Sequence, residues 1–211
     1  MTITAHSGAF DTPDNSLEFV RKVLDENCEI FEIDVTFRPE GTPVIIHKGS
    51  PGSNEGILLE DAFSLLCENG SIQLNLDLKS TANLPAVDEL LKKYGLSDRA
   101  FFTGVGKEWA ETVRANSSLP YYINADIPTF LRNYGKSVRK CAKETKDCGA
   151  IGLNTHYPNI KGDAVKIFHE EGLLVSVWTV NDEKNIKKML ACGVDNITSR
   201  HPDLVKKCIA D

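Results

Sequence analysis

The sequence predicts an α/β protein, specifically a (β/α)₈ TIM barrel. Short apolar, β-branched runs alternate with amphipathic stretches along nearly the whole chain, which is the pattern of a parallel sheet covered by helices. About eight strands are expected, and many of them end in polar residues, as barrel strands do at their catalytic mouth. The turn Gly8-Ala9-Phe10 after the first strand is neither a dinucleotide-binding nor a Walker loop, so an open doubly wound sheet is less favoured.

Nine segments have the composition of strands, one more than a barrel takes. They are Thr2–Ala5, Ile30–Phe37, Pro43–His47, Ile72–Leu78, Ala100–Thr103, Tyr121–Asn124, Ala150–Leu153, Leu174–Thr179 and Asp195–Thr198. One of them therefore lies outside the barrel or is misassigned. Only residues 38–42 separate the second segment from the third, which is too short for a helix, so we expect a long hairpin-like excursion there.

Helices are expected between the strands. They begin near Asn15, Glu60, Leu84, Lys107, Pro128, Lys161, Asp182 and Pro202. Asn15, with Glu18 three residues later, resembles a capping box, whereas Asp182 and Gly193 have the positions of an opening cap and a closing glycine. No linker, repeat or low-complexity stretch interrupts the chain, so residues 1–211 are interpreted as a single domain.

The composition is that of an ordinary globular protein, with 41% hydrophobic and 26% charged residues in a chain of 211. The net charge of −6 disfavours nucleic-acid binding, and no apolar stretch reaches the roughly 18 residues of an integral membrane segment. The N-terminus lacks the features of a signal peptide, and the six cysteines form no CxxC pair, which indicates reduced thiols and a cytoplasmic protein. The sequence leaves the oligomeric state open.

Glu32 and Asp34 place two carboxylates on one face of the second strand, because side chains at i and i+2 point the same way. Burying two like charges so close together costs several kcal/mol each without compensation. A divalent cation is the usual compensation, so this pair predicts a metal site. The alternative is a solvated strand edge that carries two surface acids.

Asn75, Asp77 and Lys79 also share one face of a strand, opposite a leucine-rich face. A polar inward face is normal at the mouth of a barrel, where strands end. The residues alone leave two interpretations open: a catalytic role, or a structural Asp–Lys pair.

His6 and His47 each end a predicted strand, and Gly8 lets the backbone turn close to a ligand after His6. Two imidazoles that flank one substrate suit general acid and base catalysis near neutral pH. Trp178 ends another predicted strand and either forms one wall of a substrate pocket or packs in the core. The other histidines receive no role.

Several runs together resemble the glycerophosphodiester phosphodiesterase family. They are Ala5-His6-Ser7-Gly8, Pro13-Asp14-Asn15-Ser16-Leu17, Glu32-Ile33-Asp34-Val35, Gly41-Thr42-Pro43-Val44-Ile45-Ile46-His47, Val177-Trp178-Thr179-Val180-Asn181 and Gly193-Val194-Asp195-Asn196-Ile197-Thr198 with Pro202. The resemblance covers nearly the whole chain in the right order. It implies a barrel of the phospholipase C-like phosphodiesterase type, with little or no insertion domain, that hydrolyses glycerophosphodiesters to glycerol 3-phosphate and an alcohol.

The resemblance also implies roles for individual residues. His6 and His47 would be the acid–base pair. One divalent cation, Mg²⁺ or Ca²⁺, would be held by Glu32, Asp34 and Asp77. The small-molecule phosphodiester substrate would be bound by Lys79, Trp178, Ser7 and Lys48.

The chain departs from the family pattern near the expected phosphate. Ser7 stands where the family usually has a phosphate-binding arginine, Lys48 replaces an Asp, Asp77 replaces a Glu, and the segment 48–56 is short. Lys48 or Arg38 is the predicted substitute for that arginine, because both lie near His47 in the chain. The departures leave two alternatives: a phospholipase D-like or sphingomyelinase D-like lyase that forms a cyclic phosphate, or a catalytically weak barrel that binds phosphodiesters.

Overall fold

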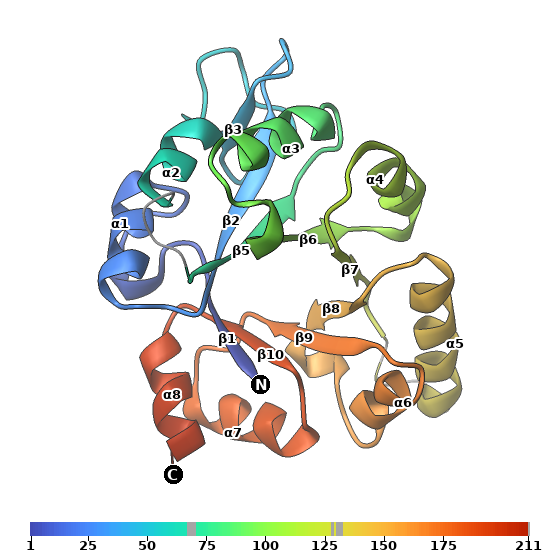
Figure 1. The fold of residues 1–211 in the computed structure, drawn as a ribbon. Helices are drawn as coiled ribbons and strands as arrows, with labels where there is room; N and C mark the ends of the chain where they lie inside the picture. The colour runs from blue at the N-terminus through green and yellow to red at the C-terminus, as the bar shows by residue number, and fades with distance from the viewer. Residues whose placement is uncertain (67–70, 128, 130–132, 211) are drawn as a thin grey trace.

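The computed structural model of this protein describes residues 1–66, 71–127, 129 and 133–210. Within these residues, eight parallel strands close into a barrel, as predicted (Figure 1). The barrel strands are β1 (Thr2–Ala5), β2 (Ile30–Phe37), β5 (Gln73–Leu78), β6 (Ala100–Val105), β7 (Tyr121–Asn124), β8 (Gly152–His156), β9 (Leu174–Trp178) and β10 (Asn196–Ser199). The ring closes because β1 pairs in parallel with both β10 and β2.

The extra predicted strand lies outside the barrel. β3 (Pro43–Ile45) runs antiparallel to β2, and β4 (Ile57–Leu58) runs antiparallel to β3. The strand predicted to reach His47 ends at Ile45, because the Lys48 amide turns back onto the carbonyl of Ile46. The two residues of β4 are too few to produce a periodic pattern, so the sequence did not predict this strand.

The helices form a ring around the barrel (Figure 1). They are α1 (Leu17–Asp25), α2 (Leu59–Leu66), α3 (Leu84–Lys93), α4 (Ala110–Asn116), α5 (Tyr134–Asp147), α6 (Ala164–Glu170), α7 (Glu183–Cys192) and α8 (Pro202–Ala210). The helix start predicted near Pro128 lies outside the described residues, and a 3₁₀ turn, Lys107–Trp109, precedes α4. In the part of the chain that the structure describes, no helix has the length and apolar character needed to cross a bilayer.

The caps of α1 and α7 test two sequence predictions. Ser16, rather than Asn15, is the N-cap of α1: its Oγ accepts a hydrogen bond from the Phe19 amide at 3.0 Å. The predicted cap at Asn15 was therefore wrong by one residue. The predictions for α7 are confirmed, since Asp182 caps its start and Gly193 ends it in the left-handed conformation, with φ of 75°.

Apolar side chains fill the space between strands and helices, whereas much of the barrel interior is polar. Its buried polar side chains include Thr4, Asn75, Thr103, Asn154, Ser176, Asn196 and Thr198. Many of these groups are hydrogen-bonded across strands: Asn196 Oδ1 accepts from Thr4, and Asn196 Nδ2 donates to Ser176, both at 3.0 Å. The candidate site lies at one end of this polar interior.

β8 begins and ends later than the sequence predicted. The expected strand Ala150–Leu153 is replaced by Gly152–His156, which pairs with β9 from Leu174 to Trp178. Its first residue packs very tightly: a Cβ on Gly152 would lie 2.3 Å from the carbonyl oxygen of Leu174 and 2.9 Å from the ring of Tyr122.

We expect Gly152→Ala to lower the free energy of unfolding by about 1 to 3 kcal/mol, because the new methyl group meets backbone of the adjacent strand. Urea denaturation followed by circular dichroism measures this change. Gly135→Ala is the matched control: an added Cβ there meets no atom within 4 Å, so in the first turn of α5 it should be neutral or slightly stabilising. Equal stability of the two variants would contradict the tight β8–β9 packing.

Candidate active site at the barrel mouth

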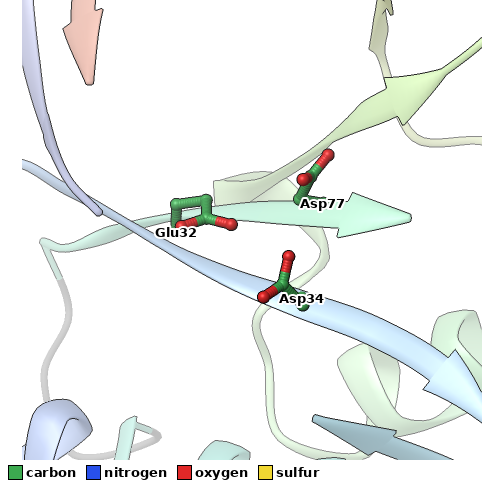
Figure 2. A group of neighbouring side chains, drawn as sticks. All are labelled: Glu32, Asp34 and Asp77. Carbon is green, nitrogen blue, oxygen red and sulfur yellow. The ribbon is translucent and has the colours of Figure 1, made fainter. Parts of the chain in front are cut away.

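Three carboxylates converge on two neighbouring strands at one end of the barrel. Glu32 and Asp34 project from β2, and Asp77 projects from β5 (Figure 2). Asp34 pairs in register with Asp77, so the two side chains start side by side. One carboxylate oxygen from each residue lies within 4.8 Å of the other two. The predicted spacing of Glu32 and Asp34 on one face is confirmed, and Asp77 joins them.

The charges in this cluster are unevenly compensated. Burial, together with the nearby Asp34 and Asp77, holds the pKa of Glu32 well above its usual value. Burial acts in the same direction on Asp34, but Lys79 and Asn15 outweigh it and lower the pKa of that carboxyl. The Lys79 ammonium lies 2.8 Å from Asp34 and 2.5 Å from Asp77, which confirms that the lysine faces the cluster. Asp34 and Asp77 in turn raise the pKa of Lys79 despite its burial.

The donor set fits a hard divalent cation. Its three ligands are carboxylate oxygens, the class of ligand that Mg²⁺ and Ca²⁺ bind. Glu32 is buried, and among the described residues no positive side chain is hydrogen-bonded to it, so negative charge remains to be balanced within the cluster. The cluster is therefore compatible with a divalent metal ion.

Asn15 holds Asp34 in place. Its Nδ2 donates to Asp34 Oδ2 at 2.6 Å, and its Oδ1 accepts from the Asp34 amide at 2.9 Å. The residue is buried and left-handed, with φ of 50°, a conformation that asparagine tolerates better than most side chains. Sequence reasoning missed this role and assigned Asn15 to a helix cap. Its place in the run Pro13-Asp14-Asn15-Ser16-Leu17, one of the family-like motifs, was the available signal.

His6 lies beside Glu32 and is mostly buried. Its Nδ1 is 2.7 Å from the carbonyl oxygen of Ser7, so Nδ1 carries the proton and donates it. Burial lowers the pKa of His6, and the positive charge of Arg200 lowers it further. The ring is thus neutral at pH 7, with a lone pair on Nε2.

His47 contacts a different carboxylate of the cluster, Asp34. It follows β3 by two residues, and its Nδ1 lies 3.1 Å from Asp34 Oδ2. The side chain is 77% exposed, in contrast to His6. The structure therefore brings both predicted histidines to the carboxylates, although His47 does not end a strand as expected.

The residues predicted to contact the phosphate have local partners. The Ser7 amide donates to Glu32 Oε2 at 2.9 Å, and its Oγ accepts from the Asn15 amide at 2.6 Å. Lys48 pairs with the exposed Glu55 at 2.6 Å. Arg38 donates to the backbone carbonyls of Glu55 and Gly56, so it braces the excursion after β2.

A small cavity of about 30 Å³ lies among the predicted residues. It is lined by His6, Glu32, Asn75, Asp77, Thr103, Asn154, Trp178 and Thr198. Trp178 is 36% exposed, and its ring lies 5.5 Å from that of His156 between centroids. Because β8 extends to His156, this histidine belongs to the mouth, whereas the sequence placed it off the strands and gave it no role. Trp178 thus forms a wall of this cavity.

The chain is similar to known proteins in both sequence and structure. The family model described as the glycerophosphoryl diester phosphodiesterase family matches residues 56–204. A glycerophosphodiester phosphodiesterase of Bacillus altitudinis is 25% identical, over 97% of this chain and 96% of its own.

Two solved structures share the fold. A phosphodiesterase of Oleispira antarctica, in complex with the product sn-glycerol-3-phosphate, has a TM-score of 0.80 at 20% identity, over 100% of this chain and 97% of that one. A glycerophosphodiester phosphodiesterase of Parabacteroides distasonis has a TM-score of 0.78 at 22% identity, over 99% and 96%.

The matched residues 56–204 contain Asp77, Lys79 and Trp178, while His6, Glu32, Asp34 and His47 precede them. The match spans well over half of the chain, and the closed barrel agrees with it. The chain therefore belongs to the glycerophosphoryl diester phosphodiesterase family of phosphoric diester hydrolases.

Proposed function

We propose that the protein hydrolyses glycerophosphodiesters to sn-glycerol 3-phosphate and an alcohol, with His6 and His47 as its acid–base pair. The observation that carries this proposal is the convergence of three carboxylates beside two histidines at one end of the barrel. The family match supports the substrate class, as does the product bound by the similar Oleispira phosphodiesterase.

Glu32, Asp34 and Asp77 would hold one divalent cation, Mg²⁺ or Ca²⁺. When bound, such a cation would neutralise charge on the phosphodiester oxygens and on the transition state. Lys79, whose ammonium contacts Asp34 and Asp77, would add a positive charge beside the phosphate.

His6 is the better candidate for the general base. Because Nδ1–H is committed to the Ser7 carbonyl, Nε2 of the neutral ring presents its lone pair for a proton from the nucleophile, which is water or a substrate hydroxyl. His47 would be the general acid: its Nδ1 lies 3.1 Å from Asp34 Oδ2, so Nε2 is the ring nitrogen that would donate a proton to the leaving oxygen. The two histidines would thus act as base and acid on one substrate.

Trp178 would line the substrate pocket next to His6. Direct substrate contacts by Ser7 and Lys48 stay predictions: Ser7 is buried between Glu32 and Asn15, and Lys48 is paired with Glu55. The structure supports Ser7 more directly as a residue that orders Glu32.

We place the reaction in the cytoplasm, in the turnover of glycerophosphodiesters derived from lipids, without a nucleic-acid partner. Free thiols support the compartment. Among the described residues they are Cys28, Cys141, Cys148, Cys192 and Cys208. Cys67 lies outside the described residues.

Incubation with sn-glycero-3-phosphocholine and Mg²⁺ or Ca²⁺ tests the proposal. Phosphorus NMR should show sn-glycerol 3-phosphate as the product, and EDTA should abolish turnover until the cation is restored, because the carboxylate cluster then lacks its counter-charge. A cyclic phosphate as the accumulating product would identify a lyase instead. Inactivity across a panel of glycerophosphodiesters with metal bound would indicate a binding protein, and full activity after exhaustive chelation would exclude a metal requirement.

We expect His6→Ala and His47→Ala each to lower kcat at least about 100-fold, the scale of a lost general acid or base. In the wild type, kcat/KM should fall as the pH drops through the lowered pKa of His6, so the acid limb lies below pH 6.5. Stopped assays across a pH series measure both effects. His169→Ala is the control, because His169 pairs with Asp195 at the opposite ends of the strands. A near wild-type rate in His6→Ala or His47→Ala would rule out the paired-histidine scheme.

A further inference from the structure

Arg200 is fixed beside His6 although the two residues are far apart in the sequence. It directly follows β10, and the carbonyl of Ser199, the last residue of that strand, accepts a hydrogen bond from the His6 amide at 2.9 Å. The Arg200 amide donates to Asn181 Oδ1, also at 2.9 Å. The closure of the barrel between β1 and β10 thus places the backbone of Arg200 at the mouth.

The guanidinium of Arg200 is held over the turn that follows His6. Its Nη1 and Nη2 contact the two carboxylate oxygens of Asp14 at 2.8 and 3.0 Å, a forked pair. A Cβ on Gly8 would lie 2.6 Å from Nη1 and 1.9 Å from Asp14 Oδ1. Only a glycine therefore lets the Arg200–Asp14 pair lie this close to the backbone.

The charge of Arg200 acts on the candidate site. After Asp14, the residues that raise the pKa of Arg200 are Glu32 and Asp34, two of the three clustered carboxylates. In the reverse direction, Arg200 is the cation that opposes protonation of His6. The side chain remains 37% exposed, so a ligand can reach it.

The other cations near the site are bound to groups of the excursion after β2 or of the carboxylate cluster. Arg38 donates to two backbone carbonyls, Lys48 is paired with Glu55, and Lys79 bridges Asp34 and Asp77. A guanidinium has five N–H donors, and Asp14 takes two of them, which leaves donors for a second anion.

We propose that Arg200 is a substrate-binding residue that donates hydrogen bonds to the phosphate of the diester, and that Asp14 is the residue that positions it. This inference rests on the proposed function. Planar, forked donors match phosphate oxygens well, and Asp14 reduces the conformational freedom that Arg200 would lose on binding.

The test compares Arg200→Gln with Arg139→Gln, a matched change on the outer helix α5. We expect Arg200→Gln to lower kcat/KM about 10- to 100-fold, the loss of one charge-assisted interaction, and to weaken binding of sn-glycerol 3-phosphate by the same factor in calorimetry. Mg²⁺ affinity should not fall, because Arg200 is not in the carboxylate cluster and its loss removes a positive charge near Glu32 and Asp34. Arg200→Lys should be intermediate, since it keeps the charge but loses the fork.

Asp14→Asn should raise KM by a smaller factor without lowering kcat, since it leaves Arg200 charged but unoriented. Guanidinium ion added to Arg200→Ala should restore part of the lost rate, which a purely structural role would not explain. Arg200 variants that bind sn-glycerol 3-phosphate as tightly as Arg139→Gln would overturn this inference while leaving the proposed function intact. A wild-type protein that neither hydrolyses glycerophosphodiesters nor binds sn-glycerol 3-phosphate would overturn both.

Discussion

Three carboxylates held within 4.8 Å of one another, two of them buried, constrain the rest of the barrel mouth. Such a cluster is costly in a low-dielectric interior unless donors and cations surround it. The surrounding residues supply such groups: the Ser7 amide donates a hydrogen bond to Glu32, while Asn15, His47 and Lys79 all contact Asp34. The remaining negative charge is what a divalent cation would balance.

The parallel pairing of the barrel strands brings the carboxylates and their neighbours together. Asp34 and Asp77 are register partners on β2 and β5. The pairing of the first strand, β1, with the last, β10, brings His6 next to Arg200. The polar barrel interior beneath the cluster continues this arrangement: Thr103 Oγ1 lies 3.1 Å from Asp77 Oδ1. The site therefore forms only when the barrel closes, because residues from both ends of the chain contribute to it.

Local patterns in the sequence predicted much of this site. The two-residue period predicted the shared face of Glu32 and Asp34, and the alternation of strands and helices predicted the barrel. Such local patterns could not predict contacts between residues that lie far apart in the sequence. Asn15 has the sequence position of a helix cap, so its contact with Asp34 was not predicted. The predicted phosphate-binding cations, Lys48 and Arg38, are sequence neighbours of His47, whereas Arg200 lies near the other end of the chain. Short strands and shifted strand ends, as in β4 and β8, left too little periodicity to locate them correctly.

The proposed site for a divalent cation consists of Glu32, Asp34 and Asp77. Isothermal titration of Mg²⁺ and Ca²⁺ into the wild type and Asp77→Asn tests it most directly, since Asp77 is the least buried of the three ligands and its amide replacement keeps the shape. We expect one ion per chain in the wild type and a Kd at least about tenfold higher in the variant. No saturable binding of either ion, or equal affinity in the two proteins, would contradict it.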